Sequence, residues 1–430
     1  MRYYSLNRQS PDVDFREATI RGQAPDKGLY FPERVPKLAA SFFEQMGQMS
    51  KEEVAYEIMQ PYIGNTIDTG TLKKIVAETI NFPFPLVPVN EQIDSLELFH
   101  GPTLAFKDVG ARFMSRCLGY FSRNQDKKTT VLVATSGDTG GAVANGFLGV
   151  DGVEVIILYP SGKVSQVQEL QLTTCGQNIT ALEVKGSFDD CQAMVKDAFM
   201  DADLQQYLQL TSANSINVAR WLPQQLYYFF ALQQWTDKEN FPVISVPSGN
   251  FGNICAGLLA RYSGLPIPTF IAACNVNDTI SAFLTTGIHT PKETISTVSN
   301  AMDVGNPSNL IRIIELFKIA GVPVKNILQS VTVTDAETID CISSVYDKYG
   351  YLLDPHGAVA YHALEKCTGP DQKGIMLETA HPVKFPDTVK KAIGKEPQVP
   401  DVIQPLFQLQ KQAINISPSF SVLKEWLLSR

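Results

Sequence analysis

The sequence predicts an α/β protein in which parallel sheets are covered by helices on both faces. From residue 129 onward, short apolar runs alternate with longer amphipathic segments, the pattern of strands that alternate with helices. The chain has 430 residues, 44% of them hydrophobic, and at roughly 150 residues per domain this predicts two or three domains with cores of their own. Hence we expect an α/β architecture of more than one domain.

The first ninety residues predict a separate, mostly helical module. Ser50 and Glu53 form a capping-box pattern ahead of an apolar stretch at residues 54–59, and a second helical pattern covers residues 72–80. Prolines within residues 83–88 then stiffen an extended connection that cannot continue a helix.

The main region, residues 91–430, carries the α/β pattern. We predict buried strands at residues 129–134, 153–159, 179–184, 243–246, 269–273 and 375–377. We predict helices at residues 140–148, 164–172, 188–200, 216–235, 252–262, 335–349 and 356–366. A smaller lobe is expected around 129–188, and the larger domain from the remainder. Ligands in such sheets bind in the loops that follow the strands.

Composition excludes several classes of function. Asp plus Glu exceed Lys plus Arg, 44 against 36, for a net charge of −8, so nucleic acid is not an expected partner. No run of 18 apolar residues occurs and the first thirty residues are rich in charge, which argues against a membrane span or a signal peptide and favours the cytoplasm. The seven cysteines and five histidines show no metal-ligand spacing, so we expect no metal site.

Two glycine-containing loops follow predicted strands and open helices. Residues 247–253, Pro-Ser-Gly-Asn-Phe-Gly-Asn, place backbone N–H groups at a helix N-terminus, where they suit an anion. A tight turn that uses glycine for its backbone freedom is an equally good interpretation. Residues 135–141, Thr-Ser-Gly-Asp-Thr-Gly-Gly, suit a carboxylate or a phosphate; alternatively, Asp138 and Thr139 only cap their own helix.

Three further segments carry candidate groups. Ser215, Asn217 and Arg220 could jointly hold a phosphate, or Ser215 could be a cap and Arg220 a solvated side chain. Lys107 lies among apolar residues, where desolvation would favour the free amine that Schiff-base chemistry requires; alternatively it pairs with Asp108 or lies on an exposed helical turn. The hydroxyl of Thr379, at a strand end, could bond a heteroatom of a bound ring.

Four motifs occur in one order along the chain: H-G-P-T-x-A-F-K-D, S-G-D-T-G, S-G-N-F-G-N and T-A-H-P-x-K-F. In this order the sequence resembles the threonine synthases, pyridoxal-phosphate (PLP) enzymes of fold type II, the tryptophan-synthase β-like fold. That family converts O-phosphohomoserine and water to threonine and phosphate. The resemblance covers nearly the whole chain and implies a family-type N-terminal module at 1–90 and a PLP-dependent catalytic region at 91–430.

The resemblance also implies roles for individual residues. Lys107 would hold the cofactor as a Schiff base and act as the catalytic base, and Thr379 would face the pyridine nitrogen. The cofactor phosphate would be wrapped by Gly249, Asn250, Phe251, Gly252 and Asn253. The substrate carboxylate would meet Thr135, Ser136 and Thr139, and its phosphate would meet Asn214, Ser215 and Arg220. The loop at 136–139 would also meet the cofactor's ring oxygen, and Asp138 is expected among the cofactor-binding residues. Many relatives of this fold carry Asn where this chain has Asp138, and an ionised carboxylate there would repel the ring oxygen unless it turned away to cap its helix.

Other functions fit parts of this pattern. A β-eliminating dehydratase or an amino-phosphate phospholyase would share the fold and cofactor, but a dehydratase would not need Arg220. A non-catalytic phosphate- or PLP-binding protein would keep the glycine loop without needing Lys107. We expect a small-molecule substrate and a monomer or homodimer.

Overall fold

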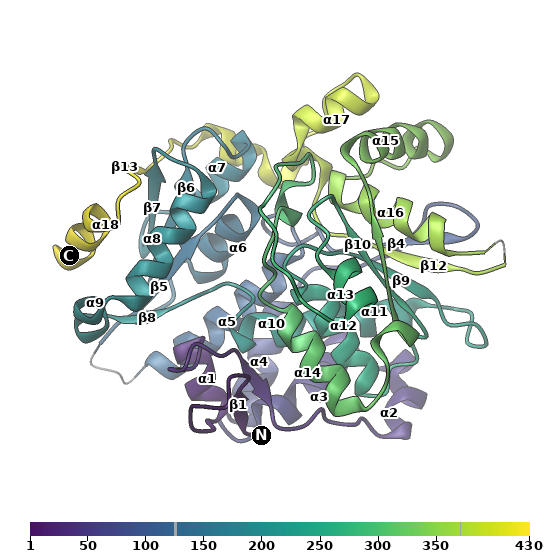
Figure 1. The fold of residues 1–430 in the computed structure, drawn as a ribbon, viewed down its shortest axis with the longest axis horizontal. Helices are drawn as coiled ribbons and strands as arrows, with labels where there is room; N and C mark the ends of the chain where they lie inside the picture. The colour runs from purple at the N-terminus through teal and green to yellow at the C-terminus, as the bar shows by residue number, and fades with distance from the viewer. Residues whose placement is uncertain (124–126, 370) are drawn as a thin grey trace.

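The computed structural model describes residues 1–123, 127–369 and 371–430 (Figure 1). A six-stranded and a five-stranded sheet lie side by side, and the N-terminal helices pack beneath them (Figure 1). Both large sheets are parallel except for one edge strand of the six-stranded sheet. The predicted α/β class is therefore confirmed.

The six-stranded sheet has the order β11-β10-β9-β12-β4-β3. Its strands are β3 (Leu86–Pro88), β4 (Ile93–Glu97), β9 (Val243–Pro247), β10 (Phe270–Cys274), β11 (Leu328–Thr332) and β12 (Gly374–Glu378). Successive side chains point to opposite faces: Ile244 joins the core beneath α12 (Gly252–Tyr262), and Val243 joins the core beneath α16 (Pro355–Cys367). Burial on both faces explains why β9 is a continuous apolar run.

The five-stranded sheet has the order β13-β7-β6-β5-β8. Its strands are β5 (Thr129–Ala134), β6 (Val153–Pro160), β7 (Ile179–Val184), β8 (Gln209–Thr211) and β13 (Ile414–Ile416). The helices of this part are α6 (Asp138–Phe147), α7 (Gln166–Thr173), α8 (Phe188–Met200) and α9 (Ala202–Tyr207). Strands β8 and β13 come from outside residues 129–188, and the lobe boundary stays a prediction.

The N-terminal elements are β1 (Tyr3–Ser5), α1 (Phe15–Arg21), β2 (Tyr30–Pro32), α2 (Ala40–Gln45), α3 (Lys51–Ile63) and α4 (Thr69–Thr79). The capping box predicted at Ser50 and Glu53 is present at the start of α3. Helices α1 and α4 contact α5 (Lys107–Ser122), and α3 contacts α11 (Leu226–Gln234). The N-terminal segment thus packs against the helices that surround Lys107.

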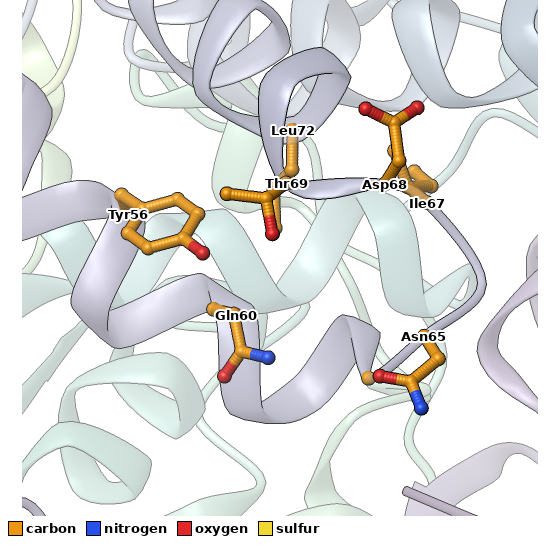
Figure 2. A pocket seen from close by; sticks show the side chains of 8 residues that line it. Tyr56, Gln60, Asn65, Ile67, Asp68, Thr69 and Leu72 are labelled. Carbon is orange, nitrogen blue, oxygen red and sulfur yellow. The ribbon is translucent and has the colours of Figure 1, made fainter.

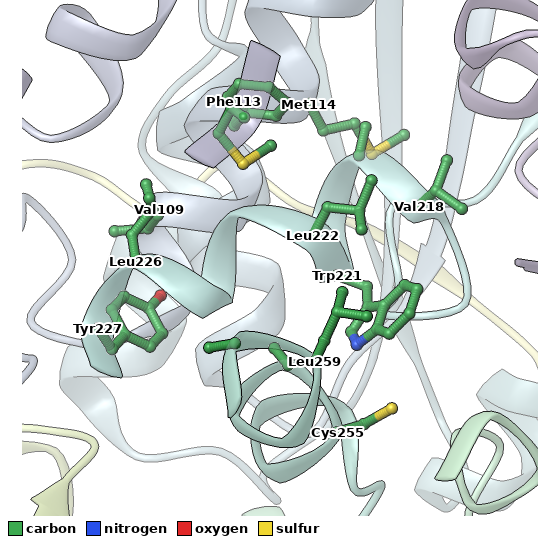
Figure 3. Packing of buried hydrophobic residues seen from close by; sticks show 14 of the residues in the cluster. Val109, Phe113, Met114, Val218, Trp221, Leu222, Leu226, Tyr227, Cys255 and Leu259 are labelled. Carbon is green, nitrogen blue, oxygen red and sulfur yellow. The ribbon is translucent and has the colours of Figure 1, made fainter. Parts of the chain in front are cut away.

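The prediction of one helix at 216–235 is wrong. The segment forms α10 (Val218–Trp221), a 3₁₀ turn η2 (Leu222–Gln225) and α11. Pro223 lacks an N–H and cannot continue the α-helical hydrogen-bond pattern at that point. Figure 3 shows the side chains of α10, η2 and α11 packed between α5 and α12.

The remaining helices lie towards the C-terminal half and at the chain's end. They are α13 (Ile280–Thr286), η3 (Asn300–Met302), α14 (Leu310–Ala320), η4 (Val324–Asn326), α15 (Asp335–Tyr349), η5 (Pro382–Lys384), α17 (Pro386–Ile393), η6 (Asp401–Gln408) and α18 (Phe420–Leu428), with η1 (Met46–Gln48) near the start. After η6 the chain crosses to the five-stranded sheet, where β13 pairs with β7 (Figure 1). Within the described residues, no helix is long and apolar enough to cross a membrane.

Candidate active site

Lys107 begins helix α5 beside the end of strand β12. The preceding turn contains Leu104 in the left-handed region, with φ of +57°, and Ala105 bridges to Ala380. The Phe106 N–H donates to the carbonyl of Thr379 at 2.9 Å. The structure therefore brings Lys107 and Thr379, which are 272 positions apart in the numbering, into adjoining segments.

The Lys107 side chain is mostly buried, with 16% exposed, and its Nζ lies 3.8 Å from Oδ2 of Asp138. Burial lowers the pKa of Lys107; Asp138 opposes that shift, while Lys384 and Arg220 add to it. A lower pKa leaves more of the uncharged, nucleophilic amine near neutral pH. Among the described residues Lys107 forms no ion pair with Asp108, whose carboxylate instead accepts from the N–H and the hydroxyl of Thr103.

Asp138 has a second cationic partner that the sequence analysis missed. Its Oδ1 lies 2.8 Å from Nζ of Lys384, whose side chain is fully buried, and it also accepts from Nε2 of Gln168 at 3.0 Å. Burial alone would raise the pKa of Asp138, but the attraction of Lys384 and then of Lys107 lowers it overall, so the carboxylate is ionised. The motif that supplied Thr379 also contains Lys384, but only the fold reveals its partner.

The loop after β5 is capped by Thr135 rather than by Asp138. The Thr135 hydroxyl accepts from the N–H groups of Gly137 at 3.0 Å and Gly140 at 2.8 Å. Within the described residues, the partly exposed Ser136 and Thr139 have no hydrogen-bond partner for their hydroxyls. These two side chains are thus available to a ligand, whereas the Thr135 hydroxyl already holds the loop.

The loop after β9 has little room for side chains. A Cβ on Gly249 would lie 2.6 Å from Cα of Met302, and one on Gly252 would lie 3.1 Å from Cβ of Ser215. Phe251 is the N-cap of α12 with φ of +56°, and no side chain caps the helix. The first N–H groups of α12 are therefore not taken by a capping side chain, as an anion site requires.

Two asparagines of this loop point to different surroundings. The Asn250 amide donates to the Ser215 hydroxyl at 3.0 Å, and its oxygen accepts from the Ser308 N–H at 2.6 Å. The Asn253 oxygen instead accepts from the Tyr228 hydroxyl at 2.9 Å, and its buried amide nitrogen finds no partner among the described residues. Asn253 thus supports the helix and leaves one buried donor for another group.

The polar side chains of the segment at 214–220 lie in different surroundings. The Ser215 hydroxyl accepts from Asn250 and, at 2.9 Å, from Asn309, so it belongs to the glycine loop and is not a helix cap. Asn217 caps α10, its oxygen accepting from the Ala219 N–H at 2.9 Å. Asn214 is partly exposed.

Arg220 is buried, at 3% exposed, and is not the solvated side chain of the alternative interpretation. It packs against Gly110, where a Cβ would lie 2.6 Å from the Arg220 carbonyl oxygen. Its Nε and Nη1 find no hydrogen-bond partner among the described residues, and no described carboxylate lies within ion-pair distance. Burial lowers the pKa of Arg220 to about 10, so the guanidinium is charged at neutral pH.

Two other features lie apart from this cluster. A surface pocket of about 260 Å³ between α3 and α4 is lined by Tyr56, Gln60, Asp68 and neighbours, and contains none of the predicted site residues (Figure 2). In the described part of the chain, no group of three or more His, Cys, Asp or Glu could hold a metal. The imidazole of His356 is hydrogen-bonded to Asp354, with its Nδ1 2.5 Å from the Asp354 carboxylate oxygen.

Comparisons with known proteins agree over the whole chain. Residues 95–376 match the family model described as pyridoxal-phosphate dependent enzyme, residues 2–80 the threonine synthase N terminus, and residues 357–426 the threonine synthase C-terminal model. The threonine synthase of Haemophilus influenzae is 42% identical, covering 100% of both chains.

Solved structures give the same result. The crystal structure of threonine synthase from Escherichia coli matches with a TM-score of 0.93 and 41% identity over 100% of both chains. The PLP-bound threonine synthase from Brucella melitensis matches with a TM-score of 0.93 and 35% identity, over 99% of this chain and 98% of that one. The fold type II prediction is confirmed, and the chain belongs to the threonine synthase family of pyridoxal-phosphate-dependent enzymes.

Proposed function

We propose that this protein converts O-phosphohomoserine and water to threonine and inorganic phosphate, with PLP bound through Lys107. The observation that carries this proposal is Arg220, a buried guanidinium without a carboxylate partner among the described residues, close enough to lower the pKa of Lys107. A buried cation needs an anion. A substrate phosphate supplies one, whereas an amino acid that loses only water brings no anion beyond the carboxylate that we assign to the loop after β5.

The residues present fit PLP. Lys107 offers a largely buried amine next to Thr379, and the Gly249 and Gly252 backbone allows a phosphate to approach the start of α12 closely. The buried Asn253 amide has a donor without a partner among the described residues. We assign Lys107 to the cofactor aldehyde, Thr379 to the pyridine nitrogen, and the phosphate to Gly249, Asn250, Phe251, Gly252 and Asn253.

Two of the residue roles are refined here. The Ser215 hydroxyl faces Asn250 and Asn309, so we assign it to the loop that would hold the cofactor phosphate, and leave the substrate phosphate to Arg220 with Asn214 nearby. Asp138 is engaged by Lys384, so we assign it to the surroundings of Lys107 and not to a direct bond with the ring oxygen.

In the reaction, protons leave the α- and β-carbons, phosphate leaves the γ-carbon, the hydroxyl of water adds at the β-carbon, and protons return to the γ- and α-carbons. When bound, PLP supplies an electron sink for negative charge next to the substrate's amino nitrogen. The freed Lys107 amine serves as the base that takes protons from the α- and β-carbons and returns them to the γ- and α-carbons, since its lowered pKa favours the uncharged form. Ser136 and Thr139, with the Thr135 loop, hold the carboxylate. Arg220 holds the phosphate before and after it leaves.

The test is to mix the purified, PLP-loaded protein with O-phosphohomoserine and measure threonine and phosphate together. Equal release of both supports the proposal. Phosphate without threonine would instead indicate a phospholyase, and a keto acid formed from threonine would indicate a dehydratase. Lys107→Ala should lose both the visible cofactor band and the activity.

Arg220→Met tests the phosphate site directly. Removing a buried charged contact to a ligand costs at least about 2 kcal/mol, so kcat/KM should fall by about 30-fold or more. Arg261→Met is a matched control, because Arg261 donates to the Ile267 carbonyl away from this cluster. Equal effects of the two variants would contradict the assignment.

Two finer expectations belong to the same proposal. We place the protein in the cytoplasm and expect a monomer or a homodimer acting on a small-molecule substrate. Cell fractionation tests the first expectation, and sedimentation equilibrium of the loaded protein tests the second.

A further inference from the structure

Asp138 lies between two lysines that come from different elements. Its Oδ1 is 2.8 Å from Nζ of Lys384, and its Oδ2 is 3.8 Å from Nζ of Lys107. The Lys384 side chain is fully buried and that of Asp138 is 4% exposed. A lysine is almost never fully buried without a partner or a purpose, and the proposed reaction gives Lys384 no direct part.

Lys384 also fixes the loop that leads to Lys107. Its Nζ donates to the Thr103 carbonyl at 2.8 Å, and that carbonyl also accepts from Nε2 of Gln171 at 3.0 Å. The Thr103 N–H in turn donates to the Asp108 carboxylate at 2.9 Å. The Lys384 ammonium group therefore links η5 to helix α6 and to the loop at Thr103, which leads to Lys107.

We propose that Lys384 is a positioning residue for Lys107: it holds Asp138 and the Thr103 loop in place and offsets the charge of the Asp138 carboxylate, so that the Lys107 amine stays uncharged and nucleophilic. This inference rests on the proposed role of Lys107 as the cofactor-binding lysine. It assigns Lys384 no contact with substrate or cofactor.

The charged groups around Lys107 give the direction of the effect. They are Asp138 of α6, Lys384 of η5, Arg220 of α10 and Asp354 at the start of α16; the two carboxylates favour the ammonium form, and the two cations oppose it. Removing Lys384 deletes one of the two cations that oppose the ammonium form of Lys107. It also leaves Lys107 as the only described cation within ion-pair distance of Asp138. Both changes favour the ammonium form, so the pKa of Lys107 should rise by about one unit or more.

The experiment measures the protonation of Lys107 itself. The full-length protein, freed of cofactor, is labelled with trace acetic anhydride over a range of pH, and the acetylated Lys107 peptide is quantified by mass spectrometry. The labelling midpoint should move to higher pH in Lys384→Met, to lower pH in Asp138→Asn, and back towards wild type in the double variant. Lys384→Arg should keep the wild-type midpoint. Lys424→Met, which removes a lysine paired with Asp201 and Asp203 elsewhere, should also leave it unchanged.

An unchanged or lowered midpoint in Lys384→Met would overturn the proposal, as would a raised midpoint in Asp138→Asn. If Lys384→Met does not fold, as judged by its thermal transition, Asp138→Asn and Lys384→Arg still decide the matter. The measurement uses neither substrate nor turnover. A failed midpoint shift with normal threonine formation therefore refutes only this inference, and a shift without threonine formation refutes only the proposed reaction.

Discussion

Replacing Arg312 with methionine tests how a buried cation joins the N-terminal segment to the segment at 215–216. Arg312 is fully buried, and its guanidinium lies 4.3 Å from the centroid of the Trp221 ring. It donates to the carbonyls of Ser215 at 2.8 Å, Ile216 at 2.6 Å and Tyr30 at 3.1 Å. A fourth bond reaches the side-chain oxygen of Asn309 at 2.8 Å.

The expected cost follows from these contacts. Methionine keeps apolar packing against Trp221 but removes the donor to three backbone carbonyls, and each buried polar group left without a partner costs about 1–3 kcal/mol. The variant no longer has to desolvate a guanidinium, which offsets part of that cost. We expect the free energy of unfolding to fall by about 3 kcal/mol.

Equilibrium urea denaturation followed by far-ultraviolet circular dichroism measures this difference. Arg261→Met serves as the control, because Arg261 is partly exposed and donates to a single carbonyl, that of Ile267; its cost should stay below about 1 kcal/mol. If Arg312→Met were as stable as Arg261→Met, the argument that Arg312 ties Tyr30 to the segment at 215–216 would fail.

Three further predictions follow from single contacts. Gly249→Ala should weaken PLP retention at least about tenfold in equilibrium dialysis, because the new Cβ would lie 2.6 Å from Cα of Met302 and the loop must shift. Burial raises the pKa of all seven thiols, so a disulfide reagent should react slowly with the native protein and rapidly with all seven in urea. Burial, then the Asp354 carboxylate, raises the pKa of Glu378 well above its usual value. The folded protein thus binds that proton more tightly than the unfolded chain and loses stability as the pH rises past the usual carboxyl range, so Glu378→Gln should gain melting temperature relative to wild type from about pH 5 to about pH 8.

The sheets were predictable because their strands are buried on both faces. The prediction at 129–134 coincides with β5, and the one at 179–184 coincides with β7. Strand β4 was missed, since its sequence Ile-Asp-Ser-Leu-Glu has only two apolar residues, three positions apart, and shows neither an apolar run nor the two-residue period of a strand. In the sheet, β4 pairs with β12 on one side and with the short edge strand β3 on the other. The sequence of β4 alone does not indicate which strands it pairs with.

The candidate site was predictable where one loop supplies the chemistry, and not where distant segments meet. The loops after β5 and β9 carry their glycines and hydroxyls within a few residues. Lys384 forms an ion pair with Asp138, 246 positions away in the sequence, and Arg312 donates a hydrogen bond to Tyr30, 282 positions away. A lysine or arginine in sequence alone suggests a solvated side chain, because only tertiary contacts can offset the cost of burying its charge.

The site around Lys107 contains a buried cation that no described carboxylate pairs with, although the chain as a whole is acidic. The protein carries a net charge of −8, but Arg220 is buried and has no described carboxylate within ion-pair distance, and together with Lys384 it opposes the ammonium form of Lys107. Holding the Arg220 charge out of water without an anion lowers stability. A ligand phosphate would neutralise this charge, so part of its binding free energy would come from compensating a desolvated cation that is already present in the protein. This is the physical reason to expect that Arg220, rather than the hydroxyls of the β5 loop, decides which leaving group the site accepts.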